Sequence, residues 1–303
     1  MSKINLLFLS IFITILIPTI SYSQQDEQSS MYMFNPLQFN PAYAGSRGAL
    51  TGTAVMRAQW VGVKGAPMTQ FVSLHGPMAY NPLGFGLHIS NDRAGEIYKT
   101  AVYGDMAYSL KLNRKGHRLN FGASAGMDFM SLNFGNLVAN EPDVNKIKNI
   151  SLNNFNFGLG AYYYSKRFYA GFSVPRFNST DWDGVNLTSK HYFFAMGYVH
   201  PINSVVDLKT STLVKFTQNA PLTVDVNANL FFYKTFWVGG MYRYNESAGV
   251  NIAFQIKEQW MFGYSYDFIY NGLSRSGTMG SHEVMLTYDM NGKRLTYTSP
   301  RYF

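Results

Sequence analysis

Side chains of alternating polarity recur along most of this chain. An aromatic ring stands at every even position from Trp260 to Tyr270, and the positions between them are mostly small or polar until Ile269. Successive side chains of a β-strand point to opposite faces, so this stretch has one apolar and one mostly polar face. A transmembrane β-barrel offers lipid to the first face and a polar interior to the second. The pattern therefore predicts a strand of a membrane barrel.

The same alternation recurs in at least three further segments. The apolar set, predicted to face lipid, includes Phe121, Phe129, Val224, Val226, Val250 and Ile252. The polar set, predicted to face the lumen, includes Asn120, Asp128, Asp225, Asn227 and Asn251. Charged groups are costly on the lipid face of a barrel, so their place in the polar set supports this assignment.

Fourteen segments of about ten residues fit strands that cross a membrane. They are 50–60, 69–76, 83–91, 100–113, 117–132, 153–164, 167–176, 189–200, 205–217, 222–233, 235–245, 248–257, 259–270 and 282–291. From the fourth strand onward, tight turns mostly alternate with longer links, as in outer-membrane barrels with short periplasmic turns and longer outer loops. A soluble exported β-sandwich, the alternative, gives no reason for this alternation. We predict an all-β fold, an antiparallel barrel of about 14 strands with both termini periplasmic.

The N-terminus has the features of a secretory signal peptide. A single Lys3 precedes the apolar run 4–20, and Ser21 and Ser23 supply the small residues that a signal peptidase reads. We therefore expect a signal peptide at 1–23, an N-terminal periplasmic segment at 24–49, a barrel at 50–291 and a C-terminal tail at 292–303. The expected location is the bacterial outer membrane, with its lipid as one partner.

Composition excludes other modes of attachment and binding. The chain has no cysteine, so it has neither disulfides nor a lipidated cysteine. After the signal peptide no apolar stretch is long enough for a spanning helix. The net charge is +8, but the basic residues are scattered, which argues against nucleic acid as a partner.

The segment 31–45 ahead of the barrel contains two Asn-Pro pairs five residues apart. Proline removes a backbone donor and holds the preceding residue extended, so the pattern predicts an ordered, turn-rich segment and not a strand. Its aromatic side chains need to be buried against other parts of a protein. Two interpretations remain open: a plug or lid in the periplasmic mouth of the barrel, and a docking surface for a periplasmic partner.

Two motifs stand near the start of the barrel. The first, at 32–45, has the form Tyr-x-x-Asn-Pro-x-x-x-Asn-Pro-Ala-Tyr-Ala-Gly, and the second, at 59–67, has the form Gln-Trp-Val-Gly-x-x-Gly-Ala-Pro. Both resemble the opening of the PorP/SprF family of type IX secretion system membrane proteins. Residues 281–288 and 299–303 resemble the last strand and the closing residues of the family. The residues that carry the two motifs, and that form the candidate partner-docking or plug segment, are Tyr32, Asn35, Pro36, Asn40, Pro41, Tyr43, Gly45, Trp60, Gly62, Gly65 and Pro67.

The resemblance implies a non-enzymatic outer-membrane component of the secretion and gliding-motility machinery of the Bacteroidota. It also implies the partners: periplasmic ring or motor proteins, or a secreted adhesin with a C-terminal sorting domain. Because fold does not fix function, an outer-membrane diffusion channel or a hydrophobic-solute transporter is the alternative.

The side chains themselves suggest no catalytic centre, cofactor site or metal site. None of the six histidines stands at a metal-ligand spacing, and Ser281 and His282 are strand neighbours that face opposite ways. Charged residues predicted in the lumen either pair across strands or line a solute path. They are Arg57, Asp105, Lys111, Asp128, Lys209, Lys215, Asp225, Asp267 and Asp289.

Overall fold

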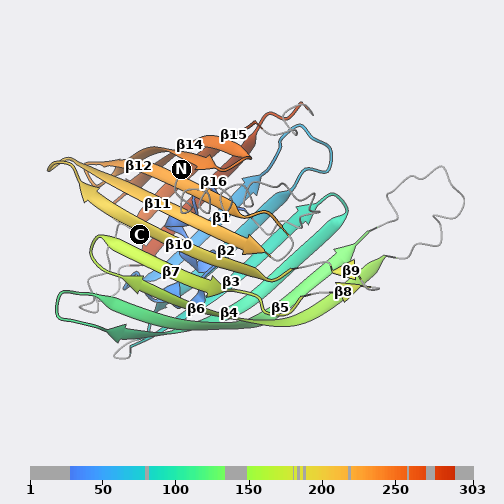
Figure 1. The fold of residues 1–303 in the computed structure, drawn as a ribbon, viewed down its shortest axis with the longest axis horizontal. Coiled ribbons are helices and arrows are strands. Elements are labelled where there is room, and N and C mark those ends of the chain that lie inside the picture. Colours follow the sequence, from blue (N-terminus) through green and yellow to red (C-terminus); the bar gives the residue numbers. More distant parts are fainter. Residues whose placement is uncertain are drawn as a thin grey trace, which may run out of the picture.

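The protein is a closed antiparallel β-barrel (Figure 1), seen in a computed structural model. The structure describes residues 28–78, 82–133, 149–179, 181–182, 185–186, 189–217, 220–257, 259–270 and 277–290. Within these residues fourteen strands follow one another around the wall, and β1 pairs with β16 from Leu50↔Met290 to Ala58↔His282. This last pairing closes the barrel, so no strand edge of the wall faces lipid.

The strands match the fourteen predicted segments in number and order. The wall consists of β1 Leu50–Ala58, β2 Met68–Pro77, β3 Leu83–Ala94, β4 Ile97–Lys111, β5 Arg118–Leu132, β6 Ile150–Tyr164, β7 Phe168–Val174, β10 His191–Pro201, β11 Val206–Thr217, β12 Thr223–Phe232, β13 Phe236–Arg243, β14 Ser247–Ile256, β15 Trp260–Ile269 and β16 Ser281–Met290. The predicted all-β barrel is therefore confirmed.

Alternating polarity determines which face of each strand points outward. On β5, Phe121 is 53% exposed while Asn120 is 1% exposed, and on β14 Val250 and Asn251 divide in the same way. The aromatic residues at even positions of β15 lie on the outer face, as predicted. An apolar outer surface around a closed wall is what a barrel in lipid requires.

Strand boundaries were wrong in two places, and one small hairpin was not predicted. Strand β1 ends at Ala58 and not at residue 60, because Trp60 has a φ of 48° and leaves the strand direction. Strand β3 ends at Ala94 and β4 begins at Ile97, so both extend further into the predicted link between 91 and 100. Gly95 at a φ of 60° allows the two-residue turn that joins them. The link after β7 contains a small hairpin, β8 Asp181–Trp182 paired with β9 Val185–Asn186. Strands of two residues are too short to show an alternation of polarity in the sequence.

The two ends of the barrel differ in their connections. At the near end, where β1 begins and β16 finishes, the links between strands run from three residues (165–167) to six (112–117). At the far end, where β1 finishes and β16 begins, four links are longer: 59–67, 133–149, 175–190 and 270–280. The expected signal peptide 1–23 and the C-terminal tail 292–303 lie outside the described residues. No helix in the described ranges is long and apolar enough to span a membrane.

Candidate functional site

Residues 28–49, here called the lumen segment, run inside the barrel. They form three short 3-10 helices, η1 Tyr32–Phe34, η2 Pro36–Gln38 and η3 Pro41–Tyr43, whose residues are buried except for Gln38. The two Asn-Pro pairs explain η2 and η3, because a proline in the first turn loses no helical hydrogen bond. Asn40 caps η3 by accepting a 3.0 Å bond from the Ala42 amide. The segment buries aromatic side chains in a lumen whose wall carries both polar and aromatic side chains.

The start of the lumen segment is held at the far end by Glu283 on β16. The Glu283 carboxylate accepts hydrogen bonds from the Ser29 hydroxyl at 2.7 Å and from the Ser30 and Met31 amides at 2.8 and 3.0 Å. Arg57 on β1 donates to the same carboxylate at 3.0 Å. Because Glu283 is fully buried, these four bonds satisfy a charge that would otherwise be very costly there.

Arg57 joins this contact to a second carboxylate. Its Nη2 lies 2.7 Å from Asp267 Oδ2 on β15, which also accepts a 2.6 Å bond from the Ser30 hydroxyl. Arg57 and Asp267 are 2% and 1% exposed. We call Arg57, Asp267, Glu283 and Ser30 the latch, because they connect the lumen segment to three adjacent strands, β1, β15 and β16.

A second buried arginine, Arg243, holds Gln28, which lies two residues before Ser30 of the latch. Arg243 at the end of β13 forms a bidentate pair with Asp225, at 2.8 and 3.2 Å, and donates to the Gln28 side chain at 2.9 Å. Gln28 also accepts a 3.2 Å bond from Gln59 and donates to Glu246 at 3.3 Å. Gln59 follows β1 and Glu246 precedes β14, so Gln28 lies at the far rim.

Aromatic rings fill the lumen on the β11 to β13 side. Phe34 meets Trp237 edge to face with ring centroids 5.5 Å apart, and Trp237 stacks on Phe231 at 3.7 Å. The Lys209 ammonium lies 4.9 Å from the Phe34 ring centroid and 5.4 Å from that of Trp237. These contacts place a cation over aromatic faces in a region shielded from water.

The later part of the lumen segment is fixed at the near end of the barrel by hydrogen bonds between asparagine side chains and backbone carbonyls. Asn40 donates to the Ala161 carbonyl at 3.1 Å, and Asn120 donates to the Ala42 carbonyl at 3.1 Å. Gly122 on β5 makes room for this approach, because a Cβ there would lie 2.3 Å from the Ala42 nitrogen. The wall thus supplies the polar partners that the buried backbone of the segment needs.

The structure separates the predicted docking or plug residues into two groups. Tyr32, Asn35, Pro36, Asn40, Pro41 and Tyr43 are buried in the lumen, and Gly45 lies near the near end beside Gly76 and Gly84. Trp60, Gly62, Gly65 and Pro67 belong instead to the far-rim loop 59–67. There the Val61 amide donates to the Gly280 carbonyl at 2.8 Å, and the Gly95 amide donates to the Gly65 carbonyl at 2.9 Å. The two family motifs therefore do not form one continuous surface.

Sequence reasoning missed most of the latch. It placed Arg57 and Asp267 in the lumen but did not connect them, and it assigned no role to Glu283. The available signal was strand parity: all three charges lie on inward positions within three residues of the far end of their strands. Ser29 and Ser30 carried no signal, because a Gln-Ser-Ser sequence is common in exposed segments.

Most of the predicted lumen charges form ion pairs, some with each other and some with residues outside the predicted set. Lys215 lies 3.5 Å from Asp225, Asp128 lies 3.6 Å from Arg176, and Asp289 lies 2.8 Å from Arg47 of the lumen segment. Lys111, at the end of β4, is exposed. The paired groups therefore form networks inside the lumen.

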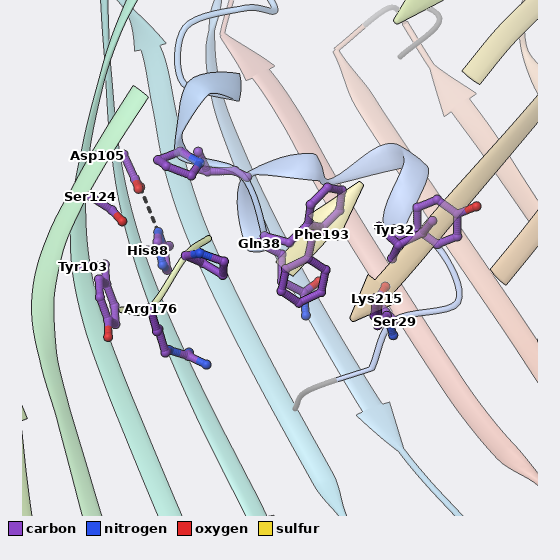
Figure 2. Close-up of a pocket in the computed structure, with 15 residues that line it drawn as sticks. Ser29, Tyr32, Gln38, His88, Tyr103, Asp105, Ser124, Arg176, Phe193 and Lys215 are labelled. Atoms are coloured by element: carbon purple, nitrogen blue, oxygen red, sulfur yellow. Dashed lines mark hydrogen bonds and ion pairs between the residues drawn. The ribbon is translucent and has the colours of Figure 1, made fainter. Parts of the chain in front are cut away.

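A pocket with a cavity volume of about 30 Å³ remains between the lumen segment and the wall (Figure 2). Its lining includes His88, whose Nδ1 lies 2.8 Å from Asp105, and Tyr103, which donates to Asp128 at 2.9 Å. A catalytic triad would also need a serine hydroxyl bonded to the histidine. In the described part of the chain the hydrogen bonds of His88 include none from a serine, and no cluster of three potential metal ligands is present there.

Comparison with known proteins gives a family match and distant structural likenesses. The family model of the type IX secretion system membrane protein PorP/SprF matches residues 21–288. No curated protein matches the chain. Among solved structures, the outer membrane protein Omp33 of Acinetobacter baumannii has a TM-score of 0.48 at 10% identity, over 80% of this chain and 100% of that one. KdgM porin has a TM-score of 0.39 at 10% identity, over 80% and 99%.

Proposed function

The chain belongs to the PorP/SprF family of type IX secretion system membrane proteins, and from this premise we propose that it anchors or recognises other proteins of that system without acting as an enzyme. As a closed barrel with an apolar outer face, it is a protein of the bacterial outer membrane. Its proposed partners are periplasmic ring or motor proteins, or a sorting-domain adhesin whose export and surface attachment it helps.

The filled lumen supports this role over that of a diffusion channel. The lumen segment buries Tyr32, Phe34, Leu37 and Tyr43 inside the wall, and hydrogen bonds to buried carboxylates hold its start. A diffusion channel needs a continuous aqueous path, and the buried rings and paired charges of the lumen argue against one here. A barrel without such a path serves better as a membrane anchor with exposed rims.

We propose that the near end of the barrel faces the periplasm. This orientation is supported by its short connections, since outer-membrane barrels keep short turns on the periplasmic side and longer loops outside. The far-rim loop 59–67 would then face outward, where Lys64 and Gly65 are exposed. We assign docking of the sorting-domain adhesin to this loop, which periplasmic partners cannot reach, and the plug role to residues 32–45.

Deleting the gene tests the role directly. We expect the deletion strain to lose at least one sorting-domain protein from its surface or medium, and the wild-type chain supplied on a plasmid to restore it. The measurement is quantitative mass spectrometry of surface and secreted proteins. Unchanged export of every sorting-domain protein would contradict the proposal.

A further inference from the structure

The lumen segment has a definite direction along the barrel. Its first described residue, Gln28, is bonded to Gln59 and Arg243 at the far rim. Its later part lies at the near end, where Gly45 approaches Gly84 at the start of β3. The chain therefore travels from the far end to the near end inside the lumen before β1 begins at Leu50 and turns back toward the far end.

The mature chain has little length left before Gln28. With the predicted cleavage after Ser23, four residues, 24–27, would remain, and they span at most about 14 Å when fully extended. A nine-residue strand such as β1 measures about 30 Å and still rises about 21 Å along the axis when tilted by about 45°. The way back is also occupied, since the lumen segment itself fills it. Four residues cannot return to the near end.

We infer that the mature N-terminus leaves the barrel at the far end, opposite to the end at which the last strand finishes. The chain is thus threaded through its own barrel. An even number of strands places the start of β1 and the finish of β16 at the same end of the barrel. It does not place the N-terminus of the chain there. This departs from the expectation that both termini are periplasmic. With the near end in the periplasm, a point that rests on the proposed function, the N-terminal amine is on the cell surface.

Single thiols can test the threading, because the chain has no cysteine of its own. Gln25→Cys reports the N-terminus, Lys64→Cys in the exposed far-rim loop reports the far end, and Lys115→Cys in the exposed β4–β5 turn reports the near end. Intact cells are treated with a maleimide on a polymer too large to pass porins, and then compared with permeabilised cells. We expect Gln25→Cys and Lys64→Cys to be labelled on intact cells and Lys115→Cys only after permeabilisation.

The comparison separates threading from orientation. If Lys115→Cys is labelled from outside and Lys64→Cys is not, the proposed orientation is wrong, and threading still requires Gln25→Cys to follow Lys64→Cys. Labelling of Gln25→Cys together with Lys115→Cys overturns the inference under either orientation.

Crosslinking gives an answer that does not depend on access from solvent. The Gln28 and Gln59 side chains are 3.2 Å apart, so a Gln28→Cys/Gln59→Cys pair should be joined by a short bifunctional thiol reagent and migrate as a looped chain. The matched pair Gln28→Cys/Lys115→Cys places its thiols at opposite ends and should stay open. Crosslinking of the second pair but not the first contradicts threading.

Discussion

Deleting residues 28–44 is expected to convert the closed barrel into an ion-conducting pore. Barrels of about eight strands are filled by wall side chains, whereas barrels of about sixteen strands leave an aqueous channel. With fourteen strands, this wall is too wide to fill itself, and the buried aromatic residues of the lumen segment occupy the space. In planar bilayers we expect single-channel conductance to rise roughly tenfold or more above that of the intact protein.

A milder variant checks the same claim if the deletion impairs folding. Gly122→Ala places a methyl group 2.3 Å from the Ala42 nitrogen, so the near-end part of the lumen segment must shift. We expect intermittent openings that the intact protein does not show. Gly104→Ala is the matched control, since no atom lies within 4 Å of its Cβ. A folded deletion variant that does not conduct would show that something other than the lumen segment closes the barrel.

Replacing Arg57 by methionine is expected to lower the stability of the folded barrel by about 3–5 kcal/mol. The change leaves Asp267 and Glu283 buried without their guanidinium partner, which lies 2.7 and 3.0 Å from them. Burying a carboxylate without a charged partner costs free energy. The hydrogen bonds from Ser30 to Glu283 and Asp267 offset only part of this cost. The measurement is the midpoint of urea unfolding in lipid vesicles.

Arg114→Met is the matched control for this prediction. Arg114 lies in the exposed β4–β5 turn, so the same change of side chain removes no buried pair. The double variant Arg57→Met/Asp267→Leu should recover part of the lost stability, because it removes one of the two stranded carboxylates. Equal unfolding midpoints for Arg57→Met and Arg114→Met would mean that the latch does not stabilise the fold.

The wall could be predicted from the sequence because it follows a local rule. Alternation of period two identifies a strand and both of its faces without reference to any other strand, which is why Asn120 and Phe121 were assigned correctly. The ends of strands were less predictable. They depend on single backbone conformations such as those of Trp60 and Gly95, which the alternation does not contain.

The path of the lumen segment could not be predicted in the same way. Its prolines exclude a strand but do not say where the turns go. The direction of the segment depends on the latch, which joins Ser30 to Glu283 across 253 positions of sequence. Such a contact follows from the pairing of β1 with β16, a register that one sequence does not reveal. The functional assignment depended on the two motifs at 32–45 and 59–67, through their resemblance to the family.

The secretion role is tested most directly by crosslinked capture of this protein from native outer membranes, with a denaturing wash and mass spectrometry of what remains. A barrel anchor of the type IX system should retain periplasmic ring proteins or a sorting-domain adhesin, and the crosslinks should map to its rims. Two results together would contradict the role and favour a channel instead. They are recovery of the barrel alone from wild-type membranes, and unchanged export of every surface adhesin in the deletion strain.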